Sequence, residues 1–219
     1  MRITRRNVVT SVGAGTIALP ALVRAATLRP TPLETLGPFY PVSRPADQDA
    51  DLTRVAGRDG TASGEVIELS GRVLASDGSP VAGAVLDVWQ ANAAGRYDSP
   101  LDANTLPLDP NFQGSAKLAT GADGRWRIVT VLPGAYPIGG GKFRTRHIHW
   151  DIQGPHGRLS TQSYFPDEEL NAKDILLGAM LGGGGGDAAA LTAKAAGKRA
   201  DGIARFEWDV VLLGPIRRN

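Results

Sequence analysis

The stretch that determines the fold is Arg144-Thr145-Arg146-His147-Ile148-His149-Trp150-Asp151-Ile152. Apolar and polar side chains alternate along it, which is typical of a half-buried β-strand. Because side chains two residues apart on a strand share a face, His147 and His149 are predicted to project together. Three apolar side chains are predicted on the opposite face: Ile148, Trp150 and Ile152. Two imidazoles at this spacing can reach one cation, but a pair of partly exposed strand histidines fits this stretch equally well.

Short apolar runs separated by turn residues continue this pattern along the chain. The 219 residues include 28 glycines and 15 prolines, a composition that favours short strands joined by turns. Further strands are predicted over Val66–Ala75, Ala84–Gln90, Arg125–Leu132, Leu159–Phe165 and Ile203–Leu213. A helix is predicted from Asp187 to Lys194. The fold class that follows is all-β, a β-sandwich with long loops and one short helix.

The residues from 26 to 64 are predicted to form an N-terminal arm in front of the first strand. Leu28–Asp59 is rich in Pro, Gly and Asp and has little apolar periodicity, which indicates extended or loop backbone rather than helix. Within it, Thr35-Leu36-Gly37-Pro38-Phe39-Tyr40-Pro41 places two aromatic rings among turn formers. The simplest interpretation is an arm that packs these rings against the sandwich.

Residues 1–25 have the organisation of an export signal. Met1–Arg6 carries three arginines and no acid, Val8–Val23 is an apolar run, and Val23-Arg24-Ala25 offers a cleavage position before Ala26. The pair Arg5-Arg6 resembles a twin-arginine signal. A membrane anchor is the alternative, but the run is short for a membrane span. We therefore expect a periplasmic or otherwise exported protein whose domain covers residues 26–219.

The net charge depends on whether residues 1–25 are removed. Lys and Arg together number 24, and Asp and Glu number 22. The leader holds four arginines and no acid, so its removal leaves 20 basic against 22 acidic side chains, a net charge of −2. The sequence pI of about 9.1 therefore reflects the leader, and we expect no nucleic-acid partner. After cleavage, no stable membrane association is expected.

Two tyrosines in loops can supply the oxygen ligands that a histidine-based metal site needs. The chain has no cysteine, so thiolate ligands are absent. Tyr97 lies in Gly95-Arg96-Tyr97-Asp98 and Tyr136 in Gly134-Ala135-Tyr136-Pro137. A phenol ionises near pH 10, but a bound cation stabilises the phenolate. Two phenolates and two neutral imidazoles are hard donors that suit iron(III), although spacing alone does not establish such a site.

Four motifs follow one another along the chain: Asp87-Val88-Trp89-Gln90-Ala91-Asn92-Ala93-Ala94-Gly95-Arg96-Tyr97, Leu108-Asp109-Pro110-Asn111-Phe112, Pro133-Gly134-Ala135-Tyr136-Pro137, and Arg144 followed by His147-Ile148-His149. In this order they resemble the motifs of the intradiol ring-cleavage dioxygenases, and of their protocatechuate 3,4-dioxygenase-like branch in particular. The resemblance extends from about Thr31 to Leu213. It implies a sandwich with a transthyretin-like (prealbumin-like) core that serves as the catalytic domain.

The resemblance also implies roles for single residues. The iron(III) ligands would be Tyr97, Tyr136, His147 and His149, and Tyr136 would leave the metal when a catechol binds. Arg144 would stabilise negative charge on the bound substrate, and Gln162 would line the oxygen-binding side. The residues expected to border or contact the substrate are Thr35, Gly37, Pro38 and Trp89. Strand alternation places Arg144 opposite His147, so its role requires a bend before the strand.

The implied reaction is cleavage of a catechol ring between its two hydroxyl-bearing carbons, with both atoms of O₂ incorporated, to give a cis,cis-muconate-type dicarboxylate. The pattern departs from the family at Phe39, where a tyrosine is common, and near Gly139–Gly141, where a tryptophan is common, so the particular catechol stays open. A single chain also leaves homo-oligomerisation open. The alternative function is a non-catalytic transthyretin-like binding or spacer module, which Leu69–Asp98 and Thr120–Tyr136 also resemble. That alternative requires none of the four ligands.

Overall fold

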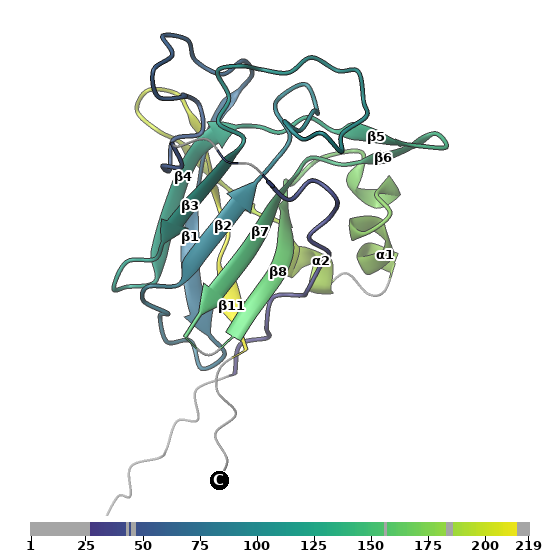
Figure 1. Cartoon of the computed structure of the whole chain (residues 1–219). Coiled ribbons are helices and arrows are strands. Elements are labelled where there is room, and N and C mark those ends of the chain that lie inside the picture. Colours follow the sequence, from purple (N-terminus) through teal and green to yellow (C-terminus); the bar gives the residue numbers. More distant parts are fainter. Residues whose placement is uncertain (1–26, 43, 45–46, 156, 183–185, 214–219) are drawn as a thin grey trace, which may run out of the picture.

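The computed structural model describes residues 27–42, 44, 47–155, 157–182 and 186–213. These residues form two β-sheets packed face to face, with two short helices at one side (Figure 1). The predicted all-β sandwich is confirmed. The signal predicted over residues 1–25 lies outside the described residues and stays a prediction. None of the helices in the described ranges has the length and apolar composition needed to cross a membrane.

The first sheet has five strands organised around the long strand β1. Its members are β1 (Val66–Ala75), β4 (Arg125–Val131), β9 (Lys194–Lys198), β10 (Ala204–Glu207) and β11 (Val210–Leu212). β4 pairs antiparallel with β1, whereas β10 and β11 follow one another along the other edge of β1 in parallel register.

The strand predicted over Ile203–Leu213 is therefore interrupted, and Asp209 gives the physical reason. The Asp209 carboxylate accepts a hydrogen bond from the Arg72 backbone N–H at 2.8 Å, a bond that a strand carbonyl would otherwise accept. At the same break, the Trp208 carbonyl oxygen lies so close to Gly71 that a Cβ there would meet it at 1.8 Å. The interruption thus needs glycine at position 71.

The second sheet is antiparallel and carries the histidine strand. Its order is β3 (Ser115–Ala119), β2 (Val85–Trp89), β7 (His147–Gly154) and β8 (Gly157–Tyr164). The sequence did not predict β3, because its alanines and lysine have little preference for strands and only pairing with β2 orders them. The predicted alternation of β7 is confirmed, since Ile148, Trp150 and Ile152 lie in the core between the sheets.

The prediction of one helix, from Asp187 to Lys194, is wrong in number and extent. Helix α1 covers Leu177–Gly182 and helix α2 covers Gly186–Leu191. Helix α2 ends early because the sheets capture the following backbone. The Ala193 N–H donates to the Tyr164 carbonyl at 2.8 Å, and β9 starts at Lys194 and pairs with β10.

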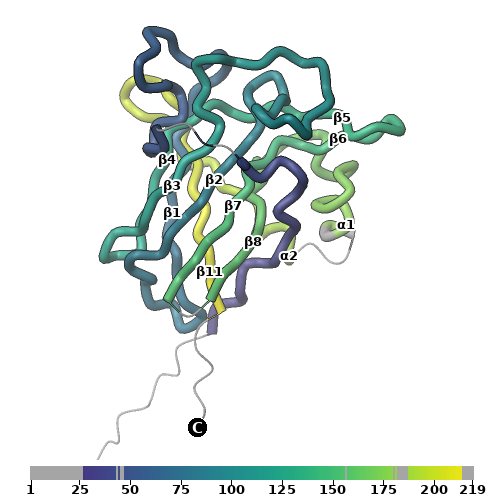
Figure 2. The backbone as a smooth tube through the Cα atoms, in the orientation of Figure 1, coloured from purple at the N-terminus to yellow at the C-terminus, as the bar shows by residue number. Residues whose placement is uncertain are grey.

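A small hairpin and the arm complete the fold. β5 (Tyr136–Gly139) and β6 (Lys142–Arg144) form a two-stranded hairpin that projects from the sandwich (Figure 1). From residue 27 to 64 the described backbone forms no regular helix or strand, as predicted for an arm. The first part of the arm runs beside β8 (Figure 2), where the Glu34 N–H donates to the Ser160 carbonyl at 2.9 Å.

Candidate metal centre

Four side chains meet on the face of β7 that points away from the core. Around Nε2 of His147 lie Nε2 of His149 at 3.2 Å, Oη of Tyr136 at 3.4 Å and Oη of Tyr97 at 3.5 Å. The four side chains are between 2% and 5% exposed. The structure thus brings together, from three separate segments, all four residues predicted as metal ligands.

Each of these side chains is placed by a different local feature. Residues His147 and His149 share a face because β7 is a regular strand, paired with β8 and β2. Tyr97 lies in the loop after β2, where its backbone N–H donates to the Asp102 carboxylate at 2.8 Å. Tyr136 opens β5, directly opposite Arg144 on β6. The loop placement predicted for Tyr97 is confirmed, whereas Tyr136 begins a strand.

The protonation of the histidines leaves nitrogen lone pairs inside the cluster. Nδ1 of His147 lies 2.6 Å from the Thr145 carbonyl, which can only accept a hydrogen bond, so Nδ1 carries the proton and Nε2 has a free lone pair. Burial, reinforced by the charge of Arg144, lowers the pKa of His147 to about 3. Burial lowers the pKa of His149 well below its ordinary value, with His147 and Arg144 adding to the effect. Both rings are therefore neutral at neutral pH.

This donor set fits a single hard cation. Metal–ligand bonds of about 2.0–2.2 Å at tetrahedral angles separate neighbouring ligand atoms by roughly 3.3–3.6 Å, close to the spacing observed. Burial raises the pKa of both Tyr97 and Tyr136, so without a cation both phenols stay protonated. Within the described part of the chain, no three His, Cys, Asp or Glu side chains form a group that could hold a metal, so the tyrosines are essential to this one.

Arg144 lies beside this cluster because the chain breaks between β6 and β7. Thr145 and Arg146 separate the two strands, so Arg144 does not follow the alternation of β7. This break is the bend that the sequence required for Arg144 to reach the histidine face. Arg146, in this break, is partly exposed and pairs with Glu168 at 3.2 Å.

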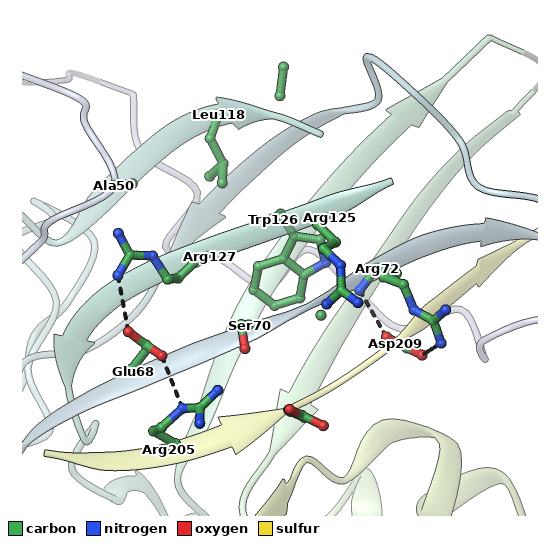
Figure 3. A pocket seen from close by; sticks show the side chains of 13 residues that line it. Ala50, Glu68, Ser70, Arg72, Leu118, Arg125, Trp126, Arg127, Arg205 and Asp209 are labelled. Carbon is green, nitrogen blue, oxygen red and sulfur yellow. Dashed lines mark hydrogen bonds and ion pairs between the residues drawn. The ribbon is translucent and has the colours of Figure 1, made fainter. Parts of the chain in front are cut away.

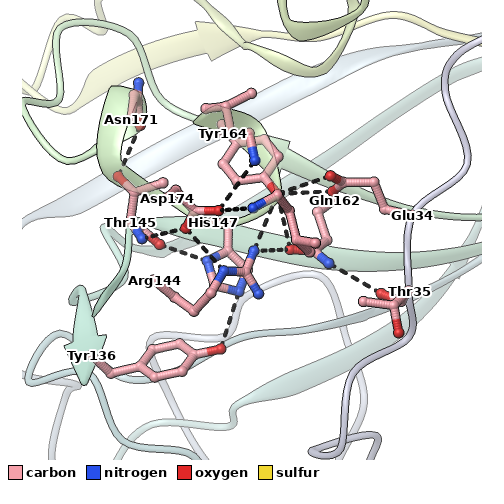
Figure 4. A network of polar contacts seen from close by, with 12 residues as sticks. Glu34, Thr35, Tyr136, Arg144, Thr145, His147, Gln162, Tyr164, Asn171 and Asp174 are labelled. Carbon is pink, nitrogen blue, oxygen red and sulfur yellow. Dashed lines mark hydrogen bonds and ion pairs between the residues drawn. The ribbon is translucent and has the colours of Figure 1, made fainter. Parts of the chain in front are cut away.

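The guanidinium of Arg144 is held in a buried polar network (Figure 4). Its Nε donates to Asp174 at 2.9 Å, and its Nη2 donates to the Gln162 side-chain oxygen at 2.6 Å and to the Tyr164 hydroxyl at 3.1 Å. The Tyr164 hydroxyl in turn donates to Glu34 at 2.9 Å. Gln162, predicted near the site, sits directly opposite His149 on the neighbouring strand.

The arm covers the cluster from the side opposite the core. The side-chain amide of Gln162 donates to the Thr35 carbonyl at 3.0 Å. Gly37 has a φ of +72°, and a Cβ there would lie 3.1 Å from the His149 ring. Phe39 stacks on Tyr97 with ring centroids 4.6 Å apart. The close approach of the arm to His149 therefore depends on glycine.

The remaining two predicted substrate residues lie at the edge of the site and behind it. Pro38 is exposed next to Gly37. Trp89 is 1% exposed, and its ring stacks on His149 at 5.1 Å with an interplanar angle of 9°. Trp89 thus supports a candidate ligand ring from within, and its contact with substrate stays a prediction.

Sequence reasoning missed three residues of the network: Glu34, Tyr164 and Asp174. Asp174 had a usable signal, because an aspartate directly before the apolar run Ile175-Leu176-Leu177 is typical of a helix N-terminus. For Glu34 and Tyr164 no local signal exists, because the two residues meet across 130 positions of sequence.

A polar hollow lies on the outer face of the first sheet, away from the cluster. It has a volume of about 760 Å³, and its lining includes Glu68, Arg72, Arg127, Arg205 and Asp209 (Figure 3). None of the residues predicted for the site lines it. Its arginines are paired with Glu68, Asp209 and the neighbouring Asp123, so the hollow holds no cluster of unpaired cations comparable to an anion site.

The fold and the cluster together define a β-sandwich protein with a mixed tyrosine–histidine centre. Residues 35–214 match a family model described as Dioxygenase. The chain belongs to the intradiol ring-cleavage dioxygenase family.

Known relatives are consistent with this membership. The chain is 45% identical over 141 residues to the protocatechuate 3,4-dioxygenase beta chain of Burkholderia cepacia, covering 63% of this chain and 60% of the relative. It is 31% identical over 157 residues to the hydroxyquinol 1,2-dioxygenase of a Rhizobium species, covering 65% of this chain and 50% of the relative. The chain thus spans 60% and 50% of the length of these two curated relatives.

A solved structure matches most of the chain. It is the dioxygenase domain of a dioxygenase–carbohydrate-binding fusion protein from Streptomyces sp. SirexAA-E. The two share 30% identity and superpose with a TM-score of 0.63, covering 84% of this chain and 99% of that domain.

Proposed function

We propose that this protein catalyses iron(III)-dependent intradiol cleavage of a catechol-type ring with O₂, giving a cis,cis-muconate-type dicarboxylate. The observation that carries the proposal is the convergence of Tyr97, Tyr136, His147 and His149, with their donor atoms 3.2–3.5 Å from His147 Nε2. Family membership supports the reaction class, since the relatives are named as catechol-type dioxygenases.

Iron(III) would be held by the two phenolates and the two imidazole Nε2 atoms. When bound, it would supply the Lewis acidity that draws electron density from the aromatic ring and makes the ring reactive toward O₂. The protein prepares for this by setting the tautomer of His147 through the Thr145 carbonyl, which directs Nε2 into the cluster. The stacked Trp89 ring keeps His149 in a single orientation.

Arg144 would stabilise the negative charge of the bound substrate, and Tyr136 would accept a proton from it. A catechol would bind as a dianion after losing two protons, one of which passes to solvent, and the buried guanidinium of Arg144 would stabilise that negative charge. The Tyr136 oxygen can accept one of the protons, because a phenol oxygen that no longer contacts a cation is protonated at neutral pH. The arm and the β5–β6 hairpin exclude water, as the low exposure of all four ligands indicates.

The test is to measure bound iron, visible absorption and oxygen uptake with a panel of catechols. Wild-type protein is expected to bind about one iron per chain, to be reddish-brown from tyrosinate-to-iron charge transfer, and to consume O₂ with at least one catechol. His147→Ala is expected to lose iron and at least about 100-fold in turnover. Tyr136→Phe is expected to keep iron with altered colour and slower turnover.

Tyr40→Phe is the matched control, because the Tyr40 hydroxyl donates to Asp87 at 2.9 Å and belongs to neither the cluster nor its network. It should keep colour and iron content. A colourless wild-type protein that binds no iron would favour the non-catalytic sandwich module. Turnover that survives His147→Ala would reject the ligand assignment.

We also propose that residues 1–25 export the protein through a twin-arginine-type signal, on the strength of the Arg5-Arg6 pair and the apolar run that follows. Sequencing the N-terminus of protein from the periplasmic fraction should find Ala26. Protein that stays in the cytoplasm with Met1 in place would contradict export.

The protein is further proposed to form oligomers, because one relative is named as the beta chain of its enzyme. Light scattering of purified protein measures the assembly directly. A mass equal to that of a single chain at all concentrations would indicate a monomer.

A further inference from the structure

The residue that orients Arg144 can be identified from its contacts. Arg144 ends the three-residue strand β6, whose other two residues are exposed, so the strand itself gives the long side chain little packing. Its guanidinium is nevertheless buried, with a side-chain exposure of 7%, and its direction is set by hydrogen bonds. Nε is bound by Asp174, while Nη2 is bound by Gln162 and Tyr164. None of these three bonds uses Nη1.

The Asp174 carboxylate is itself fixed by four N–H groups. Oδ2 accepts from Nε of Arg144 at 2.9 Å and from the Thr145 backbone at 2.8 Å. Oδ1 accepts from the backbone N–H groups of Leu176 at 2.9 Å, just before α1, and of Leu177 at 3.2 Å, the first residue of α1. The side chain of Asp174 is fully buried, with 0% exposure. A carboxylate held in this way has no freedom to follow a moving arginine.

One bond of Asp174 acts on the backbone rather than on the arginine. Asp174 accepts a hydrogen bond from the backbone N–H of Thr145, which lies at the break between β6 and β7. This break places Arg144 beside Tyr136 and His147. The adjacent Thr145 carbonyl is the group that sets the tautomer of His147. A single carboxylate therefore binds both the arginine and the backbone N–H of Thr145, the residue whose carbonyl orients a candidate iron ligand.

We propose that Asp174 is a positioning residue for the ring-cleavage reaction, which holds the Arg144 guanidinium in the orientation that stabilises the bound catechol. The proposal rests on the proposed function, because it gives Arg144 a substrate to stabilise. It also explains how a short exposed strand can present an arginine accurately: the carboxylate comes from a different segment, 30 residues further along the chain.

Asp174→Asn separates the positioning role from the helix-capping role. Asparagine has the same shape and keeps one acceptor oxygen for the first turn of α1, but its NH₂ group would face two donors, Arg144 Nε and the Thr145 N–H. We expect kcat for catechol to fall by roughly 100-fold, as a displacement of about 1 Å at a reacting centre commonly causes. Anaerobic affinity for catechol, read from the visible spectrum, should fall by roughly tenfold, while iron content stays at the wild-type level.

A double-mutant cycle with Arg144→Gln shows whether Asp174 acts through the arginine. If it does, the double variant Arg144→Gln, Asp174→Asn loses no more activity and affinity than Arg144→Gln alone, within about twofold. If the two losses multiply, Asp174 acts independently of Arg144 and the proposal is wrong. The matched control is Glu68→Gln, which neutralises another buried, arginine-bound carboxylate on the outer sheet face and should leave both readouts unchanged.

Asp174→Glu covers the case in which Asp174→Asn does not fold. It keeps the charge but moves the carboxylate by one methylene, so iron binding should persist while kcat falls at least tenfold. Wild-type kcat in Asp174→Glu would reject the positioning role. A wild-type protein that cleaves no catechol would instead reject the proposed function, and wild-type cleavage with kcat of Asp174→Asn within about threefold would reject only the role of Asp174.

Discussion

Two polar clusters, one on the outer face of each sheet, both pair arginines with carboxylates, but they differ in how far these charges are withdrawn from water. On the outer face of the first sheet, Glu68 is bound by Arg127, Arg199 and Arg205, whose side chains are between 34% and 62% exposed. On the histidine face of the second sheet, one arginine and one aspartate form an ion pair with exposures of 7% and 0%. The first is a solvated network, whereas the second is withdrawn from water.

The histidine face also carries four neutral donors that point at one another. Neutral imidazoles and protonated phenols at 3.2–3.5 Å gain little from each other, and they leave lone pairs directed into one small volume. On the outer face, by contrast, the carboxylates of Glu68 and Asp209 are already matched by arginines. A functional site is thus recognised less by the number of charged groups than by buried donor atoms that converge on one small volume.

The largest effect on stability is expected on the histidine face, from the titration of Glu34. The hydrogen bond from Tyr164 and the charge of Arg144 offset only part of the cost of burying its ionised carboxylate. Burial raises the pKa of Glu34 from 4.5 to about 7. Because its folded pKa exceeds its unfolded value, its contribution to stability is complete below about pH 4.5 and is lost as the pH rises through about 7. The loss is up to about 3 kcal/mol.

Glu34→Gln is neutral at every pH and should remove this dependence. Urea unfolding of iron-free wild type and variant between pH 4.5 and 8 measures it, and the difference between the two proteins cancels the titration of other groups. Asp174 and Tyr164 also face Glu34 and are retained in both proteins. Parallel stability curves for the two proteins would show that Glu34 does not titrate in this range.

A smaller effect is expected on the outer face from Glu68→Gln. The substitution leaves three arginines around a neutral amide, but their exposure lets water screen them, so we expect a loss of about 1–2 kcal/mol in the free energy of unfolding. Denaturant unfolding at low and high salt measures the loss, which should shrink at high salt. A loss of iron or of catechol cleavage in this variant would mean that the two faces are coupled.

The smallest effect is expected from comparing Gly37→Ala with Gly57→Ala. Both glycines have positive φ, +72° and +78°, so each substitution should cost about 1 kcal/mol of stability from backbone strain alone. Only at Gly37 would the new Cβ meet another group, the His149 ring at 3.1 Å, whereas nothing lies within 4 Å at Gly57. Thermal unfolding should thus give similar losses, and only Gly37→Ala should change the visible spectrum of the iron-loaded protein. Identical spectra would show that the arm does not press on His149.

Much of the fold and of the cluster was predictable from sequence because it depends on local alternation. The faces of Ile148 and His149 follow from the two-residue period of a strand, which the pairing of β7 with both neighbours preserves. Tyr97 and Tyr136 stand out in the sequence by their positions beside turn residues, the family resemblance implies their role as ligands, and the structure places them with the histidines. Local patterns failed where tertiary hydrogen bonds overrode propensity, as at the early end of α2 and the break at Asp209.

The sequence by itself determined which side chains alternate, that cysteine ligands are absent, and that two histidines share one face. Only the tertiary structure decided that Arg144 reaches that face, because the break before β7 depends on a carboxylate supplied by Asp174 from outside the strand. It also decided the partnership of Glu34 and Tyr164, which no local pattern encodes across 130 residues. Periodicity reports on neighbours a few residues apart, whereas the charge balance of a buried site depends on which distant segments fold against it.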